Sequence, residues 1–287
     1  MPDFPIIDAH VHLWNPQEVR MTWLDNSPAL NRPFGLEDYT NATQGVQVRG
    51  FVYLEVDIDP AYTIVEAQRI RALSEQDERI LGIVAFAPIE DGDCVKSYLD
   101  VLTGLGPKIK GIRRLTQALP DPEFCLRPGF VRGAQILAEY GLSCDLGITH
   151  RQLGPSIELV RRCPDTRFII DHIAKPDIAE NTMEPWRQQM AEMASLPNVI
   201  CKISGVATAA NWDHWTIDDI APYVQHVFDV FGEDRVAFGS DWPVATQATT
   251  YKRWVDTVDQ LTAEWTPTAK HKLWHDNAER FYGLAGG

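Results

Sequence analysis

The stretch Ile6-Ile7-Asp8-Ala9-His10-Val11-His12 opens the chain with an apolar run that ends in two histidines two positions apart. Alternate residues of a β-strand project to the same face, so both imidazoles can be presented to one point. Two convergent imidazoles are half of a metal site or of an electrophilic pocket. The stretch therefore predicts a strand that ends in a reactive site, whose other half must come from elsewhere in the chain.

The composition of the 287 residues bounds the class of protein. With 45% hydrophobic residues the chain can bury a large core, and its length suits one α/β barrel as well as two ordinary domains. The formal net charge is -14, and no run of Lys or Arg resembles a nucleic-acid footprint, so no nucleic-acid partner is expected. The five cysteines contain no C-x-x-C pair, which favours reduced thiols. We see no signal peptide and no membrane-spanning run, and expect a cytoplasmic monomer or homodimer without a membrane partner.

Short apolar runs rich in valine and isoleucine recur along the whole chain. The eight runs are 6–10, 50–56, 81–87, 109–115, 142–148, 168–172, 199–204 and 236–241. Several are nearly continuous, as expected of strands that are covered on both faces of a parallel sheet. Between most of them lie stretches with the spacing of amphipathic helices. These stretches are 62–76, 129–140, 152–163, 184–196, 217–231, 251–261 and 266–282.

Eight strands that alternate with helices predict a single (β/α)₈ barrel, with residues 1–287 as one domain. The alternative is a doubly wound open sheet, but the phosphate fingerprint that often follows its first strand is missing here. The segment 14–39, which is rich in aromatic residues and proline, is too long for a standard loop between strand and helix. We expect it to form a loop over the barrel mouth.

Reactive residues of such a barrel lie at the carboxyl ends of its strands, where the loops gather. Ionisable residues close or follow seven of the eight runs: His10 and His12, Glu55 and Asp57, Arg113 and Arg114, His150, His172, Lys202 and Asp241. The four other histidines fall in or near helical stretches and are interpreted as structural or surface residues: His214, His226, His271 and His275. Three imidazoles and a carboxylate can complete a zinc-type site with an open position for water, or a site of water and electrophile. The members of that set are His10, His12, His172 and Asp241.

Three motifs carry a resemblance to a known family. They are IDAHVHLW (7–14), DHIAKP (171–176) and FGSDWP (238–243), followed by a closing NAERFYG (277–283). In this order they resemble the amidohydrolase superfamily, and within it the branch with L-fuconolactonase-like and L-rhamnonolactonase-like sugar lactonases and the pyrone-dicarboxylate lactonase. The resemblance covers essentially the whole chain and implies a barrel lactone hydrolase.

The resemblance also implies roles for four residues. His10, His12 and His172 would polarise the lactone carbonyl, either directly in a metal-free site or through one divalent ion, with zinc as the expected metal. Asp241 would take a proton from the attacking water and deliver it to the ring oxygen that leaves. The same four residues are the candidate metal ligands, and Glu55 is a further candidate ligand.

The two adjacent arginines at the barrel mouth are expected to differ in direction. Successive strand residues face opposite ways, so only one of Arg113 and Arg114 should enter the barrel and bind a carboxylate or ring oxygen of the substrate. The alternation does not decide between them, and we favour Arg113. Glu55 would bind substrate hydroxyls or a metal, or would pair with one of these arginines.

The other residues at the mouth are further candidates for substrate binding. His150 would contact the substrate or cap a loop. Lys202 would hold a substrate hydroxyl or pair with Asp241, because a buried ammonium needs a partner. Tryptophans that would stack on sugar C–H faces, or else only pack, are Trp14, Trp23, Trp212 and Trp242.

We therefore expect a hydrolase that opens a small sugar-acid lactone of the fucono-, rhamnono- or galactono-lactone kind. A zinc-dependent decarboxylase of the same superfamily is the second enzymatic alternative. It is disfavoured because the seventh strand offers Lys202 and Ser204 where such relatives often have a further histidine. A non-catalytic sugar-acid or metal-binding barrel is the third alternative, and loss of one of the four set members would have supported it.

Overall fold

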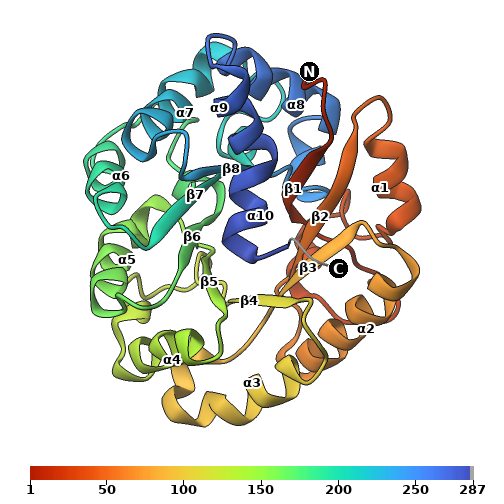
Figure 1. Ribbon diagram of the computed structural model, residues 1–287, viewed down its shortest axis with the longest axis vertical. Helices are drawn as coiled ribbons and strands as arrows, with labels where there is room; N and C mark the ends of the chain where they lie inside the picture. Colours follow the sequence, from red (N-terminus) through yellow and green to blue (C-terminus); the bar gives the residue numbers. More distant parts are fainter. Residues whose placement is uncertain (285–287) are drawn as a thin grey trace.

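The computed structural model describes residues 1–284, and its strands form one eight-stranded sheet in the order of the sequence. Each strand pairs in parallel with the next one along the chain. The strands are β1 (Ile6–Val11), β2 (Val48–Leu54), β3 (Ile80–Ala85), β4 (Ile109–Arg113), β5 (Ser143–Leu146), β6 (Phe168–Ile170), β7 (Val199–Ile203) and β8 (Val236–Phe238). Figure 1 shows them arranged around a common centre.

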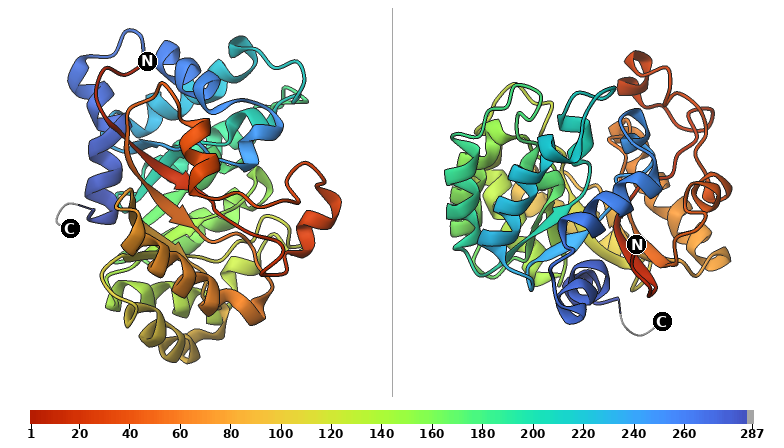
Figure 2. Two further views of the ribbon diagram at one scale, coloured as in Figure 1. Left: turned by 90° about the vertical axis from the view of Figure 1, so that its right-hand side faces the viewer. Right: turned by 90° about the horizontal axis from the view of Figure 1, so that it is seen from above.

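Helices follow the strands and cover the outside of the sheet (Figures 1 and 2). They are α1 (Leu36–Ala42), α2 (Thr63–Gln76), α3 (Val95–Thr103), α4 (Pro128–Glu139), α5 (His150–Arg162), α6 (Trp186–Ala194), α7 (Ile217–Phe231), α8 (Tyr251–Leu261), α9 (Pro267–His271) and α10 (Asn277–Tyr282). The predicted (β/α)₈ barrel is thus confirmed. Sequence reasoning missed α1 and α3, and the helix predicted over 266–282 is divided by a π-helical turn, Lys272–Asp276.

The barrel closes where the segment after β8 meets β1. The N–H of Asp241 donates to the carbonyl oxygen of His10 at 2.9 Å, and the N–H of His12 donates to the carbonyl oxygen of Trp242 at 2.8 Å. Val11 and Trp242 form a parallel bridge between these two hydrogen bonds. Closure therefore joins the two ends of the sheet at the residues that carry the candidate chemistry.

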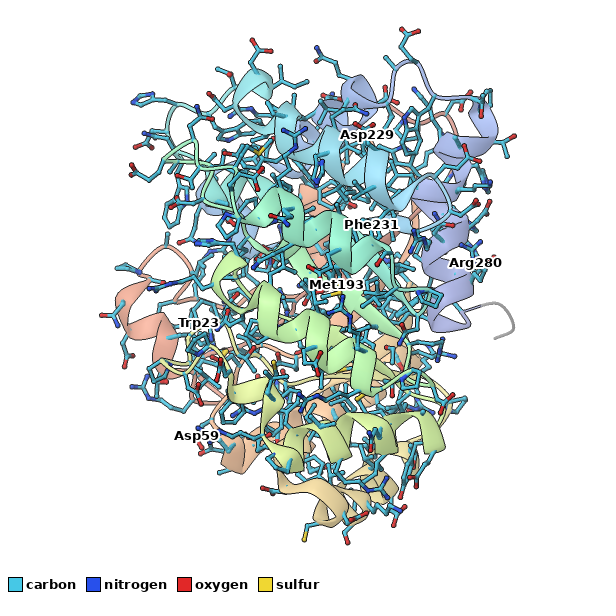
Figure 3. The ribbon with its side chains drawn as sticks, turned by 90° about the vertical axis from the view of Figure 1, so that its left-hand side faces the viewer. Trp23, Asp59, Met193, Asp229, Phe231 and Arg280 are labelled. Carbon is cyan, nitrogen blue, oxygen red and sulfur yellow. The ribbon has the colours of Figure 1, made fainter. Side chains whose placement is uncertain are left out.

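The amino-terminal end of the barrel is filled by apolar side chains and closed by α10. A small core cluster joins inward-facing strand residues to the end of the chain: Ile7, Ala9, Val52, Leu54, Val84, Ile169, Ala237, Ala278, Phe281, Tyr282 and Leu284. Figure 1 shows α10 crossing this end of the barrel. In Figure 3, Arg280 of α10 lies on the opposite side of the molecule from Trp23 and Asp59. The accessible end is therefore the carboxyl end of the strands.

Several predicted strands were too long at their carboxyl ends. The clearest cases are β6 and β8, which end at Ile170 and Phe238. The polar residues that follow leave the extended conformation, since His172 has a φ of 55° and Asp241 a φ of 59°. Positive φ is incompatible with a continued strand, so the pattern that revealed these residues also overextended the strands that precede them.

The segment 14–39 contains a short 3₁₀ helix, Thr22–Asn26, and the start of α1. An antiparallel bridge between Trp14 and Phe34 ties its two ends together. The indole N–H of Trp14 also donates to the carbonyl oxygens of Leu30 and Arg32. Figure 2 shows this red segment standing out from one end of the barrel. Separately, within residues 1–284 no helix has both the length and the apolar composition needed to cross a membrane.

One buried carboxyl group attaches α2 to the barrel. Oε1 of Glu66 accepts hydrogen bonds from the hydroxyl of Tyr53 at 2.7 Å and from the N–H of Val56 at 3.0 Å. Burial, reinforced by the nearby charge of Glu55, raises the pKa of Glu66 to about 8. The folded protein therefore keeps a proton here that the unfolded chain releases above about pH 4.5.

Glu66→Gln is expected to alter how stability depends on pH. The contribution of Glu66 is fully present below about pH 4.5 and is lost as the pH rises to about 8, whereas an amide has no proton to lose. Urea unfolding from pH 5 to pH 9 should show the wild type losing at least about 1 kcal/mol more than the variant, because one pKa unit corresponds to about 1.4 kcal/mol. Glu37→Gln, at an exposed position of α1, is the control. A wild type and Glu66→Gln variant with parallel pH profiles would contradict this assignment.

Candidate active site

Four polar side chains converge at the carboxyl end of the barrel. His10 lies on β1 and His12 just after it, while His172 and Asp241 follow β6 and β8. The Nε2 atoms of His10 and His12 are 3.1 Å apart. Oδ1 of Asp241 lies 3.4 Å from Nε2 of His12 and 3.7 Å from Nε2 of His10 and of His172. The structure thus brings together the whole set that was selected from the ends of three strands.

Hydrogen bonds to the ring nitrogens indicate where two of these imidazoles, those of His12 and His10, carry their protons. Nδ1 of His12 lies 2.9 Å from the carbonyl oxygen of Leu54, which can only accept, so Nδ1 is the donor. Nη1 of Arg113, which can only donate, lies 3.3 Å from Nε2 of His10, so this Nε2 is the acceptor. Nδ1 of His10 lies 3.3 Å from Oδ1 of Asp171 and 3.4 Å from Nζ of Lys202. In the neutral rings both Nε2 atoms therefore carry lone pairs, at a separation of 3.1 Å.

Burial favours the neutral form of two of these histidines. It lowers the pKa of His10 well below its ordinary value, although Asp171 opposes the shift, and it lowers the pKa of His172 to about 4. For Asp241 burial acts in the opposite direction, but the neighbouring imidazoles of His172, His12 and His10 outweigh it and hold its pKa below the usual range. At neutral pH the site therefore holds the ionised carboxylate of Asp241 beside the neutral imidazoles of His10 and His172.

This donor set fits a divalent cation. Tetrahedral zinc, with bonds of about 2.0–2.1 Å to nitrogen, needs donors that lie about 3.3 Å apart, close to the separations found here. The Nε2 atoms of His10 and His12 are 3.1 Å apart, a separation that suits two donors of one cation. Oδ2 of Asp241 is buried and has no hydrogen-bond partner among the described residues. His10, His172 and Asp241 also form one of two groups in residues 1–284 whose donor atoms all lie within 4.8 Å of one another.

Arg113 holds the floor of the site in place. Its Nε lies 2.6 Å from Oε1 of Glu55, and its Nη1 lies 3.2 Å from Oδ2 of Asp171. Arg113 is the arginine that points into the barrel, while Arg114 turns outward and pairs with Glu90 at 2.8 Å. Glu55 adopts the salt bridge that was one of its predicted alternatives. The structure does not place Arg114 or Glu55 where they would contact a substrate in the cavity.

Lys202 belongs to a deeper charged layer. Its Nζ lies 2.8 Å from Oδ2 of Asp145 and 2.8 Å from Oδ1 of Asp171, so the predicted pairing with Asp241 is wrong. Tyr282, at the end of α10, donates its hydroxyl proton to Asp145 at 2.5 Å. Burial raises the pKa of Asp145, whereas Lys202 and its neighbours hold the pKa of Asp171 well below its ordinary value in spite of burial. Lys202 is fully buried and therefore supports the floor of the barrel without reaching the cavity.

A cavity of about 290 Å³ is lined by three of the four residues, while His10 is fully buried. His12, His172 and Asp241 form part of its base, together with Arg113 and Lys175. Its polar walls include Ser27, Asp57, Gln117 and Gln247, and its aromatic walls are Trp14, Trp23 and Trp212. Trp23 projects from the red segment at the barrel mouth (Figure 3).

Besides Glu55, Arg114 and Lys202, two further residues predicted to bind substrate do not line this cavity. Trp242 is buried beside the barrel wall, where it packs against Phe34 and Tyr39. His150 begins α5, and its Nδ1 donates to the carbonyl oxygen of Lys175 at 3.0 Å. The sequence pattern located these residues near the mouth, but strand-end position alone does not specify which way a loop side chain points.

The histidines interpreted as structural lie away from the cavity. His214 is exposed, and Nε2 of His226 lies 2.8 Å from the carbonyl oxygen of Arg187. His271 and His275 both approach Asp276 through Nδ1, at 2.8 and 3.2 Å.

Sequence reasoning missed four residues of the site: Asp145, Asp171, Lys175 and Tyr282. Asp171 and Lys175 lie in the DHIAKP motif on either side of His172, so attention to the whole motif could have selected them. Asp145 is a carboxylate within an otherwise apolar run, which is an indication of a buried partner. No sequence signal pairs the C-terminal Tyr282 with it.

Comparison with known proteins agrees with this geometry. A protein family described as Amidohydrolase matches residues 7–284. An L-fucono-1,5-lactonase of Burkholderia ambifaria is 30% identical, over 97% of this chain and 95% of its own. An L-rhamnono-gamma-lactonase of Scheffersomyces stipitis is 25% identical, over 99% and 100%. An amidohydrolase of Burkholderia multivorans, solved with bound zinc, superimposes with a TM-score of 0.88 at 24% identity, over 98% of this chain and 100% of its own. The chain belongs to the amidohydrolase family, and it is a hydrolase.

Proposed function

We propose that this enzyme hydrolyses a small sugar lactone of the aldonolactone class. The observation that carries the proposal is the convergence of three imidazoles and Asp241 at the base of a cavity with tryptophan walls. The cavity volume of about 290 Å³ is at the small end of ligand pockets, which suits a monosaccharide-sized molecule. The relatives named for L-fucono- and L-rhamnonolactone hydrolysis support the same substrate class.

Asp241 is the general base in this proposal. Asp241 lines the cavity, and its Oδ2 has no partner among the described residues, so it can accept the proton of a water molecule that attacks the lactone carbonyl. After the tetrahedral intermediate forms, the carboxyl group of Asp241 returns that proton to the ring oxygen as the ester bond breaks. Water and the ester are thereby converted to a hydroxy acid without a covalent enzyme intermediate.

His10, His12, His172 and Asp241 are the residues that would hold a divalent cation, for which we propose zinc. A cation bound there supplies Lewis-acid polarisation of the carbonyl group. The hydrogen bond that Nε2 of His10 accepts from Nη1 of Arg113, and the one that Nδ1 of His12 donates to Leu54, leave each Nε2 with a lone pair and no proton. The same tautomers leave neither ring with an Nε2 proton to donate, which disfavours the metal-free alternative.

The cavity walls are suited to a polyol ring. Trp14 and Trp23 offer apolar faces to sugar C–H groups, and Gln117 and Gln247 offer amides for hydroxyl groups. Trp23 is held by a hydrogen bond from its indole N–H to the carbonyl oxygen of Val56 at 2.9 Å. These groups would fix the ring while the carbonyl lies over the histidines.

Gly205 keeps the space beside the catalytic carboxylate open. Its φ is +58°, and a Cβ at this position would lie 2.6 Å from Nδ1 of His172 and 2.7 Å from Oδ2 of Asp241. No side chain fits without moving one of these atoms. Gly232 offers a comparison, because its φ is +68° and nothing lies within 4 Å of its Cβ position.

Acid release from lactones tests the proposed reaction directly. A panel of aldonolactones, including L-fucono-, L-rhamnono- and galactonolactones, in weakly buffered indicator solution should show acid release by the wild type. Asp241→Asn should fold normally and lose turnover by about 10²-fold or more, as expected when a general base is removed. No acid release from any lactone, or carbon dioxide release from unsaturated acids instead, would contradict the proposed function. Near-normal turnover by Asp241→Asn would remove this residue from the mechanism.

The two glycines provide a matched pair of variants that tests whether the space at Gly205 is needed for activity. Gly205→Ala and Gly232→Ala should both be less stable in urea than the wild type, because both put alanine at positive φ, and Gly205→Ala should lose more because its Cβ also meets His172 and Asp241. Only Gly205→Ala should also lose lactone hydrolysis, by at least about tenfold, since small displacements of reacting groups are costly. Equal activities of the two variants would show that the space at Gly205 has no role in the site.

Metal analysis tests whether the enzyme holds the proposed zinc ion. Protein purified without chelators should contain about one zinc per chain, and removal of the metal with dipicolinate should reduce hydrolysis until zinc is added back. His172→Ala should lose the metal, while His226→Ala, outside the cavity, should retain it. Full activity in metal-free wild type would support the imidazoles alone as the electrophile.

A further inference from the structure

The turn that follows β6 has a backbone conformation that L-amino acids avoid. Four successive residues, none of them glycine, have positive φ: His172 at 55°, Ile173 at 49°, Ala174 at 60° and Lys175 at 41°. A left-handed conformation is unfavourable by roughly 1–2 kcal/mol for each such residue. The β-branched Ile173 is especially uncommon in this region. A conformation of this kind persists only where surrounding contacts impose it.

The surrounding contacts hold this turn from several directions. Ile173 is fully buried, and its carbonyl oxygen accepts a hydrogen bond from the indole of Trp186 at 2.8 Å. The N–H of Lys175 donates to the carbonyl oxygen of His172 at 2.8 Å. The carbonyl oxygen of Lys175 in turn accepts from Nδ1 of His150 at 3.0 Å. His150 thus acts on the site through the backbone of Lys175.

The turn presents two side chains to one cavity, those of His172 and Lys175. Nζ of Lys175 makes no hydrogen bond or ion pair within residues 1–284, although the side chain is only partly exposed. The other two cations at the barrel centre are each paired with two carboxylates, Arg113 with Glu55 and Asp171, and Lys202 with Asp145 and Asp171. Of these three basic side chains, Lys175 is therefore the one whose N–H donors remain available to a ligand.

A lactone is neutral, and negative charge develops during its hydrolysis at two oxygen atoms. The carbonyl oxygen becomes charged when water attacks, and the ring oxygen becomes charged when the ester bond breaks. In the proposed reaction the site of His10, His12 and His172 stabilises the charge on the carbonyl oxygen, and Asp241 accepts and returns the proton of water. The ring oxygen is left without a group that stabilises its charge before the proton arrives.

We propose that Lys175 is a catalytic residue whose ammonium group donates a hydrogen bond to the leaving ring oxygen. This inference rests on the proposed lactone hydrolysis. The bond between carbonyl carbon and ring oxygen breaks, its electron pair moves to the ring oxygen, and the proton that Asp241 took from water completes the product hydroxyl group. Lys175 keeps its own protons throughout. A donor that acts only as charge develops increases kcat and has little effect on ground-state binding.

Lys175→Met tests the proposal on the wild-type enzyme's best aldonolactone. We expect kcat to fall by about 10²-fold, as on removal of an oxyanion donor, while KM changes by less than about threefold. Lys252→Met, which alters an exposed lysine of α8, should leave both constants unchanged. An unchanged kcat, or a change confined to KM, would overturn the proposal. Inactive wild type on every lactone would instead refute the proposed function.

Oxygen exchange distinguishes a role at the leaving oxygen from a structural role. If Lys175→Met slows cleavage of the ring C–O bond, more of the tetrahedral intermediate returns to substrate. In H₂¹⁸O the lactone recovered at partial conversion should then contain more ¹⁸O per turnover than with wild type. A lower kcat with an unchanged ratio of exchange to hydrolysis would overturn the assignment to the ring oxygen.

A second variant covers the case in which methionine disturbs the turn. Lys175→Gly is compatible with the positive φ at this position and leaves room for a small amine. Added n-butylammonium should restore a measurable part of kcat in Lys175→Gly and should leave the kcat of Lys252→Met unchanged. A folded Lys175→Gly variant that no amine rescues, with an unchanged exchange ratio, would also count against the proposal.

Discussion

The closure of the barrel is the interaction on which the site depends. Two backbone hydrogen bonds, from Asp241 to His10 and from His12 to Trp242, join the first strand to the segment after the last. Oδ1 of Asp8 strengthens the junction by accepting from the N–H groups of His10 and Ser240. Because the donors of the candidate active site lie on both sides of this seam, the base and the imidazoles come within reach only when the sheet is complete. The same backbone hydrogen bonds therefore close the barrel and bring the catalytic side chains together.

Below the junction of the first strand and the segment after the last, buried charged side chains hold the side chains of the site in fixed orientations. Asp171 lies between Lys202, Arg113 and His10, and each of these contacts constrains the imidazole above it. Buried ion pairs contribute little net stability, because desolvation offsets their attraction. Their effect here is orientation, since they fix the positions of Arg113 and Lys202, which both contact the ring of His10. The apolar cluster closed by α10 excludes water from this layer and so keeps these interactions strong.

Much of the fold, and the selection of His10, His12, His172 and Asp241, could be predicted because both depend on local pattern. Apolar runs identify parallel strands, and the polar residues that end them must meet at one face of a barrel. The directions of Arg114, His150 and Lys202 could not be predicted, because they depend on partners that are distant in sequence, such as Asp145. The left-handed turn from His172 to Lys175 also has no local sequence signal, since none of its residues favours positive φ. Tertiary contacts impose that conformation, and only the three-dimensional structure reveals it.

The most direct test of the account is a crystal structure of the Asp241→Asn variant with an unhydrolysed aldonolactone. We predict that the carbonyl oxygen lies against the Nε2 atoms of His10, His12 and His172, with the ring oxygen toward Lys175. A water molecule should lie between the side chain at position 241 and the carbonyl carbon, within about 3–3.5 Å of that carbon. A lactone bound with its hydroxyl groups on the histidines and its carbonyl turned away from position 241 would contradict the account.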